Sequence, residues 1–122
     1  MGALLPGEGE IPPPIPLAQI RGIRHDVQLV REIRGGEPYE YYPVGEYIVS
    51  APGVCGGRLT FKYTRLDARH ILAELNAGRT PAELREDYPG KFPQAALDEL
   101  LHLARLNTPD VFERSVVAGP IA

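Results

Sequence analysis

Proline and glycine limit how long any helix or strand of this chain can be. The sequence contains thirteen of each, which together make up roughly a fifth of its 122 residues, against an average of about 12%. Proline has no backbone N–H to donate and fixes φ, while glycine readily adopts the backbone angles of turns and helix ends. The densest run, "PGEGEIPPPIP", predicts an extended arm over residues 1–16.

A helix is predicted after this arm. Apolar residues recur at spacings of three or four from Leu17 to Ile33, which is the pattern of one buried helix face. The pair Gly35–Gly36 is suited to end such a helix. The sequence therefore predicts a helix over residues 24–34, continued towards the N-terminus over residues 17–23.

Tyrosines and β-branched residues predict a small antiparallel sheet next. Four of the six tyrosines fall within "EPYEYYPVGEYIV", on either side of a Pro-Val-Gly turn. Two short strands are expected there, over residues 39–42 and 46–49, and a third is expected in "LTFKYT". Exposed strand edges commonly pair with a second copy, so residues 17–50 are interpreted as a dimerisation region. The residues expected at that interface are Tyr39, Tyr41, Tyr47 and Val49.

Three helices are predicted in the second half, and the first two have clear capping signals. Asp67 is a suitable N-cap before "ARHILAELNA", and Gly78 stands where a left-handed residue ends that helix. Thr80 and Glu83 form a capping box for a short second helix. A third helix starts at Pro93, and the leucines of "PQAALDELLHLARL" recur at helical spacing.

The last two of these helices have the proportions of a helix–turn–helix, which many DNA-binding proteins use. We therefore expect an α+β fold that is mainly helical. In this interpretation an N-terminal helix and a small antiparallel sheet precede a trihelical helix–turn–helix domain over residues 51–106. A tail over residues 107–122 follows.

Net charge, hydropathy and cysteine content exclude some classes of protein. The net charge of −3 excludes a generally basic nucleic-acid binder, so any nucleic-acid contact must come from a local patch. No apolar run approaches the roughly 18 residues that a membrane span needs, and a single cysteine fits a reducing compartment. We expect a soluble cytoplasmic protein.

The sequence contains no recognisable catalytic or metal-binding constellation. The three histidines are scattered without metal-ligand spacing, and "GVCGGR" lacks the Lys-Ser/Thr of a phosphate-binding P-loop. Cys55, followed by two glycines, is interpreted as a buried thiol at a tight turn rather than as a nucleophile. The sequence therefore predicts no enzyme activity and no cofactor.

One part of the chain resembles a known protein family. From "YYPVGEYIV" onward the sequence contains, in order, the loop "PGVCGGRL", the turn "YTR", the stretch "GRTPAE" and the pair "YP". This order is similar to the bacterial family catalogued as domain of unknown function 433, over roughly residues 41–105. Leu59 stands where that family often has proline, and Tyr63 stands where it often has glycine. A tyrosine disfavours positive φ, so we expect the backbone to differ at this turn.

The resemblance implies a winged or strand-augmented helix–turn–helix fold that dimerises, often through its N-terminal strands. Members of the family are often described as VapB-like antitoxins, whose usual partner is a PIN-type ribonuclease. The implied function is an antitoxin-like regulator that binds promoter DNA as a dimer and sequesters such a toxin. The alternative, from another class, is an oligomeric protein-interaction module that does not bind DNA.

A run of basic residues is the candidate nucleic-acid surface. Its members are Arg58, Lys62, Arg65 and Arg69. They are suited to contact phosphates, and Gln94 at the start of the third helix is suited to pair with adenine. The alternative is a solvated surface with Arg65 in an internal ion pair. The exposed face of the third helix is also expected to carry Asp98 and Glu99, whose charges would repel phosphate.

The tyrosines of the predicted sheet have an alternative role to that of a dimer interface, which is to stack on nucleic-acid bases.

Overall fold

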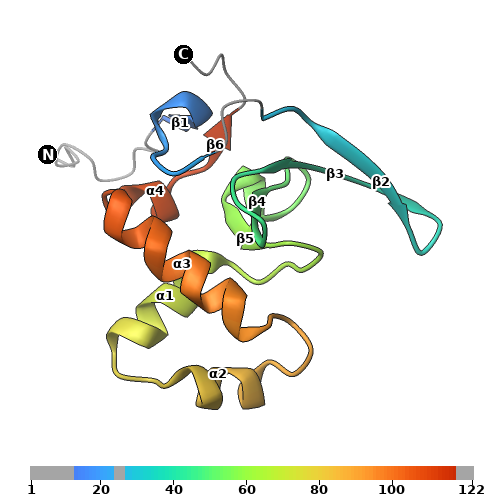
Figure 1. The fold of residues 1–122 in the computed structure, drawn as a ribbon. Helices are drawn as coiled ribbons and strands as arrows, with labels where there is room; N and C mark the ends of the chain where they lie inside the picture. Colours follow the sequence, from blue (N-terminus) through green and yellow to red (C-terminus); the bar gives the residue numbers. More distant parts are fainter. Residues whose placement is uncertain (1–12, 24–26, 118–122) are drawn as a thin grey trace, which may run out of the picture.

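The computed structural model describes residues 13–23 and 27–117. Figure 1 shows a helical part, a sheet beside it, and one long hairpin that extends away from both. In chain order the strands are β1 (Ile15–Pro16), β2 (Val30–Arg34), β3 (Glu37–Pro43), β4 (Ile48–Ser50), β5 (Leu59–Phe61) and β6 (Val116–Val117). The α-helices are α1 (Ala68–Asn76), α2 (Pro81–Asp87), α3 (Gln94–Leu106) and α4 (Asp110–Glu113). The two 3-10 turns are η1 (Leu17–Gln19) and η2 (Cys55–Gly57).

The larger sheet is antiparallel, and its strands lie in the order β2-β3-β4-β5. β2 and β3 form the long hairpin, and its two-residue turn is Gly35–Gly36, with φ of +58° and +83°. Glycine suits this turn because residues with a side chain rarely adopt positive φ at two successive positions. Since β2 is the outer strand, one of its edges has no strand partner among the described residues.

The predicted N-terminal helix is wrong. Residues 30–34 form strand β2, residues 17–19 form only the single turn η1, and residues 24–26 lie outside the described part of the chain. The spacing of Val30 and Ile33 fits a helix face, but Val30 pairs with β3 and Ile33 is 69% exposed. The glycine pair that was expected to end a helix forms a hairpin turn instead, and the β-branched residues before it favour a strand.

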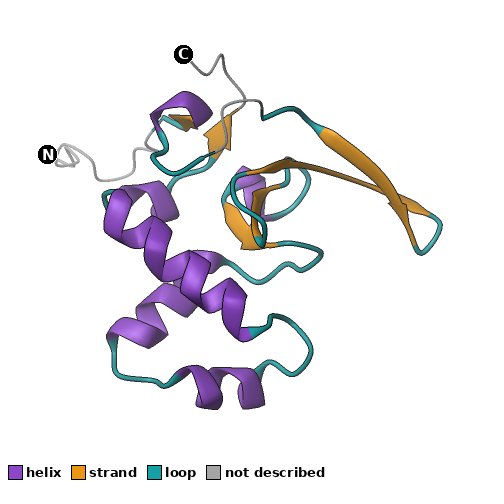
Figure 2. Ribbon diagram, viewed as in Figure 1, coloured by secondary structure: helices purple, strands orange, loops and turns teal. Residues whose placement is uncertain are grey.

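The mainly helical layout with a trihelical helix–turn–helix domain is also wrong, because α1 and α3 pack on strands β5 and β4 instead of forming a helical unit of their own. The structure is α+β, and its described residues form a four-stranded antiparallel sheet, a parallel pair of β1 and β6, and four α-helices. Strands β4 and β5 lie against helices α1 and α3, as Figure 2 shows. The core lies between these elements. Its largest fully buried side chains are Phe61, Phe112, Leu17, Ile48, Leu59, Ile71, Leu84, Leu97 and Leu100.

The predicted capping signals of α1 and α2 are confirmed. Asp67 accepts a hydrogen bond from the backbone N–H of Arg69 (2.9 Å), and Gly78 adopts a φ of +100° after the end of α1. Thr80 and Glu83 make both bonds of the capping box of α2, at 3.2 and 2.9 Å. These bonds satisfy backbone N–H groups that a helix end leaves without intrahelical partners. Local sequence therefore determines where both helices begin.

Strands β1 and β6 join the two ends of the described chain. Ile15 pairs with Val116 in a parallel arrangement. The described part of the segment predicted as a tail, residues 107–122, contains α4 and β6 and contributes buried side chains to the core. The arm predicted over residues 1–16 lies almost entirely outside the described residues.

Glu99 of α3 holds the turn between β3 and β4. Its carboxylate accepts hydrogen bonds from three successive backbone N–H groups, those of Glu46, Tyr47 and Ile48, at 2.7, 2.8 and 2.7 Å. Gly45 allows this close approach, because a Cβ at that position would lie 2.5 Å from Glu99 Cδ. The expectation that Glu99 faces solvent is therefore wrong. It is half-buried and attaches α3 to the sheet.

We expect Glu99→Gln to lower the free energy of unfolding by about 2–3 kcal/mol, because the amide removes the charge and leaves N–H groups of the turn without an acceptor. Urea unfolding followed by circular dichroism measures the change. Asp98→Asn is the matched control, since Asp98 is exposed and its hydrogen bond from Gln94 lies within α3. Equal unfolding midpoints for the two variants would show that the Glu99 carboxylate does not hold the turn.

Candidate functional site

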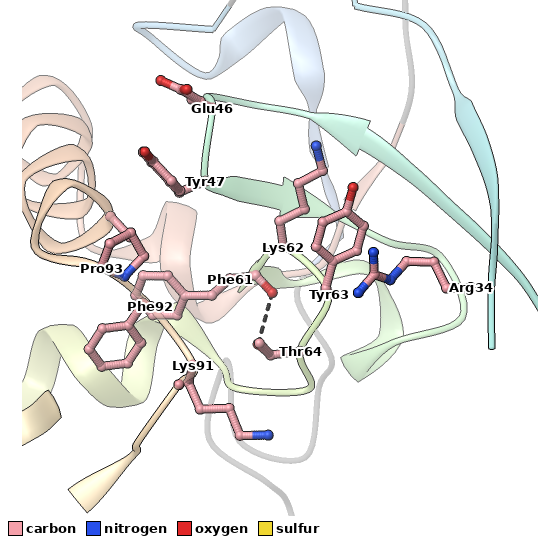
Figure 3. A pocket seen from close by; sticks show the side chains of 12 residues that line it. Arg34, Glu46, Tyr47, Phe61, Lys62, Tyr63, Thr64, Lys91, Phe92 and Pro93 are labelled. Atoms are coloured by element: carbon pink, nitrogen blue, oxygen red, sulfur yellow. Dashed lines mark hydrogen bonds between the residues drawn. The ribbon is translucent and has the colours of Figure 1, made fainter. Parts of the chain in front are cut away.

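A hollow of about 490 Å³ lies between the end of β5 and the loop that joins α2 to α3 (Figure 3). One side of it, the apolar wall, consists of Tyr47, Phe92 and Pro93. The other side, the cationic wall, consists of Arg34, Lys62 and Tyr63. Lys91 lies at the lower end of the hollow in this view.

Tyr63, in the loop after β5, has a left-handed backbone with φ of +67°. The expectation that tyrosine would avoid positive φ at this turn is therefore wrong. Such a conformation costs roughly 1–3 kcal/mol and persists only where surrounding contacts impose it. Here the Tyr63 N–H donates to the Tyr39 hydroxyl (3.0 Å), and the Tyr63 hydroxyl donates to Glu32 (2.7 Å). These contacts fix the ring at the edge of the hollow.

Two cations flank the Tyr63 ring. The Arg34 guanidinium carbon lies 3.8 Å from the ring centroid, and Lys62 Nζ lies 5.0 Å from it. Burial acts to lower the pKa of Lys62, but its contacts with the hydroxyls of Tyr41 and Tyr63 outweigh burial and raise that pKa. Lys62 is therefore charged at neutral pH. The attraction between cations and an aromatic ring holds both basic side chains in place.

Glu32 of β2 provides the negative charge beside this wall. Its carboxylate accepts hydrogen bonds from the hydroxyls of Tyr63 (2.7 Å) and Tyr41 (3.0 Å). These two bonds, first that from Tyr63 and then that from Tyr41, lower the pKa of Glu32 below its ordinary value of 4.5. The ionised carboxylate thus connects the hairpin to the loop after β5.

A second hollow, of about 350 Å³, lies on the other side of Arg34 and Tyr63. Both residues line both hollows, so they form a ridge between them. Across the two hollows lie four basic residues, which we name the cationic strip: Arg34, Lys62, Arg65 and Lys91. The carboxylates that share the lining of the hollows are Glu37, Glu40 and Glu46.

The structure separates the basic residues that were predicted to contact nucleic acid. Lys62 and Arg65 lie in the cationic strip. Arg58 instead forms an ion pair with Asp67, with Nε and Oδ2 3.3 Å apart. Arg69 is exposed on the first turn of α1. The basic run in the sequence is thus divided between the strip, an internal ion pair and a helix surface.

Arg34 and Lys91 belong to the strip but are not among the sequence candidates. Arg34 falls in a segment predicted as helix, and Lys91 lies in the aperiodic loop "YPGK". In the sequence each of them is marked only by a neighbouring glycine turn. Many basic surface residues stand beside such turns, so this signal could not identify either residue as part of a site. Gln94, the fifth predicted nucleic-acid residue, donates a hydrogen bond from its side chain to Asp98 of α3 (3.1 Å).

The four residues predicted at a dimer interface differ in exposure. Tyr41 and Val49 are buried within the chain, at 3% and 0% exposed, in a small cluster with Ala51. Tyr39 and Tyr47 are half-buried, the first beside Tyr41 and the second in the apolar wall. Their role between two copies stays a prediction.

Cys55 is a free thiol in the tight turn η2, half-buried rather than buried, with a φ of +51°. Within residues 13–23 and 27–117, no group of three or more His, Cys, Asp and Glu side chains could hold a metal ion. Over the same described ranges, every helix is too short or too polar to cross a membrane.

Part of the first hollow lies in a segment that matches a protein-family model. Residues 48–99 match the family model DUF433, a protein of unknown function. This DUF433 segment confirms the resemblance over less than half of the 122-residue chain. No curated protein and no solved structure matches the chain. Lys62, Tyr63 and Lys91 lie inside the DUF433 segment, whereas Glu32 and Arg34 lie before it.

We expect the contact between Glu32 and the tyrosines to make stability depend on pH. A carboxyl group with a lowered pKa contributes stability above its unfolded-state value, near 4.5, and that contribution is lost as the pH falls through the folded-state value. The difference in unfolding free energy between the wild type and Glu32→Gln should therefore be largest at neutral pH and shrink below about pH 4.5.

Urea unfolding at a series of pH values measures this difference. Glu37→Gln, at an exposed carboxylate of the same hairpin, is the control. A wild-type advantage over Glu32→Gln that stays constant down to about pH 3 would contradict the role given to the ionised carboxylate.

Proposed function

We propose that this protein is a small antitoxin-like regulator that binds DNA through the cationic strip. The observation that best supports this function is that cations from three separate segments line two adjoining hollows. Arg34 comes from β2, Lys62 and Arg65 come from the loop after β5, and Lys91 comes from the loop between α2 and α3. Such residues neutralise backbone phosphates and position a protein on DNA without reading its sequence.

Helix α3 begins at the edge of the strip, which fits this proposal. Pro93, at its N-cap, lines the first hollow, so phosphates bound by Lys62 and Lys91 would lie beside the first turn of α3. Gln94 is exposed at this end of α3. Its side-chain amide would contact an adenine by giving up its hydrogen bond to Asp98.

The proposed binding is weak and strongly salt-dependent. The net charge of the chain is −3, and three carboxylates lie among the residues that line the hollows. Contacts to four phosphates would give a slope of about −3.6 per protomer in a plot of log K against log salt concentration. Electrostatic attraction of this size suits a regulator that releases DNA readily.

Lys91→Ala should weaken binding to a duplex from the protein's own promoter and reduce the steepness of that slope by about 0.9, because one phosphate contact is lost. Fluorescence anisotropy with labelled duplex over a range of salt concentrations measures both quantities. Arg85→Ala is the matched control, since it removes the same charge from an exposed position of α2 outside both hollows. A flat salt dependence, or equal losses in the two variants, would rule out the strip as the DNA contact.

A second candidate function is a protein-interaction module, which the outer edge of β2 favours. This edge presents backbone N–H and C=O groups that a strand of another molecule can pair with. On the same strand Ile33 is 69% exposed, opposite Pro38 of β3. A second copy of the chain or a PIN-type ribonuclease, both implied by the family resemblance, is the partner we propose for this edge.

Ile33→Lys should shift any self-association through the β2 edge towards monomer, because it replaces exposed apolar surface with a charge that is repeated on each copy. Size-exclusion chromatography with light scattering over a range of protein concentrations measures the monomer fraction. Leu106→Lys, at another exposed apolar residue, at the end of α3, is the control. An oligomer that survives the change at Ile33 and dissociates with the change at Leu106 would place the contact elsewhere.

A further inference from the structure

The first hollow has two walls of different chemistry that face each other (Figure 3). One wall is apolar and partly aromatic, and the other carries two cations around the ring of Tyr63. A volume of about 490 Å³ lies in the range of small-molecule sites, which combine apolar surface with a few placed polar groups. A phosphate group alone would leave the apolar wall uncovered.

The apolar wall is supported from behind. Phe92 is only 6% exposed, and the ring centroids of Phe61 and Tyr88 lie 4.8 and 6.4 Å from its own. The backbone of Tyr47 is held by the Glu99 carboxylate (2.8 Å). A flat aromatic ring can lie against such a surface without displacing core side chains.

The cationic wall is ordered before any ligand binds. Arg34 and Lys62 are held against the Tyr63 ring, and two hydrogen bonds hold Tyr63 itself. Side chains that are already ordered lose less conformational entropy when they bind an anion. Lys91 adds a third cation, and Glu46 is the one carboxylate among the described residues that line this hollow.

We propose that this hollow binds a nucleotide, with its base against the apolar wall and its phosphate between Lys91 and the cationic wall. The inference extends the proposed function and rests on it in one respect, that the bound anion is a nucleotide phosphate. Bases in a duplex are paired and stacked and cannot reach the apolar wall, whereas an unpaired base can. The phosphate of a mononucleotide or of a strand end carries about 1.5 to 2 negative charges at neutral pH. Three cations balance this charge better than they would balance the single charge of an acidic side chain.

Two sources can supply this chemistry, a free nucleotide or an unpaired nucleotide at the end of a strand. Titration of ¹⁵N-labelled protein with adenosine monophosphate, inorganic phosphate and adenosine tests the site. We expect the mononucleotide to shift the amide resonances of residues 61–64, 91–92 and 94–96. It should bind about tenfold more tightly than phosphate or adenosine, because only the nucleotide engages both walls.

Further ligands identify the source of the nucleotide. Single-stranded oligodeoxyadenosine that shifts the same resonances would identify a strand as a ligand, and binding of the mononucleotide alone would identify a free nucleotide. Phosphate that binds as tightly as the mononucleotide would overturn the inference. So would an acidic aromatic peptide that binds the hollow more tightly than either nucleotide ligand.

Two variants test the walls separately. Tyr63→Gly keeps a residue suited to the left-handed backbone and removes the ring that holds Arg34 and Lys62, so the mononucleotide affinity should fall about tenfold. Tyr47→Ala should lower the mononucleotide affinity by a similar factor and leave the phosphate affinity unchanged. Arg85→Ala, outside the hollow, should change neither.

An unchanged mononucleotide affinity in both wall variants, with folding confirmed from the same spectra, would overturn the nucleotide site. The outcome is separable from that of the proposed function. Mononucleotide binding at the hollow without duplex binding would remove the proposed function and keep this inference. Duplex binding with the expected salt slope but without mononucleotide binding would keep the proposed function and overturn this inference.

Discussion

The carboxylate of Glu99 determines how the helical part of this protein meets its sheet. Three successive backbone N–H groups of the β3–β4 turn converge on it, and Gly45 provides the space for that approach. Hydrogen bonds to a charged group are worth roughly 1.5–3 kcal/mol each, more than bonds between neutral groups. Tyr47 in this turn and Pro93 at the start of α3 both line the first hollow. The same anchor therefore sets the position of the apolar wall.

The opposite wall depends on the hairpin of β2 and β3. Glu32 and Tyr39 of the hairpin hold Tyr63 in a backbone conformation that a side chain disfavours. Both lie before the segment that matches the DUF433 family. At a position where the family resemblance points to glycine, this chain has an aromatic ring and, through it, two ordered cations. The DUF433 segment and the hairpin that precedes it therefore both contribute residues to the hollow.

Sequence reasoning succeeds here where the deciding contacts are local. The caps at Asp67 and Thr80 bond to groups two or three residues away, so residue types alone identify the starts of α1 and α2. Strand β2 is misassigned because the prediction follows the spacing of Val30 and Ile33, which fits a helix face, over the β-branched residues and the glycine pair, which favour a hairpin with β3. Two residues of the cationic strip, Lys62 and Arg65, belong to the basic run in the sequence, whereas Arg34 and Lys91 come from distant segments. No local pattern connects them, since the fold alone brings them together.

The pairing of β1 with β6 closes nearly the whole described chain into one loop. Arg114 Nε donates to the carbonyl oxygen of Pro13 (2.7 Å) across 101 positions, and the Ile15 N–H donates to the carbonyl oxygen of Ser115 (2.9 Å). Closing so long a loop has an entropic cost that is met only after the intervening residues have become compact. We therefore infer that this closure forms late in folding, and that its release is an early step when the chain unfolds.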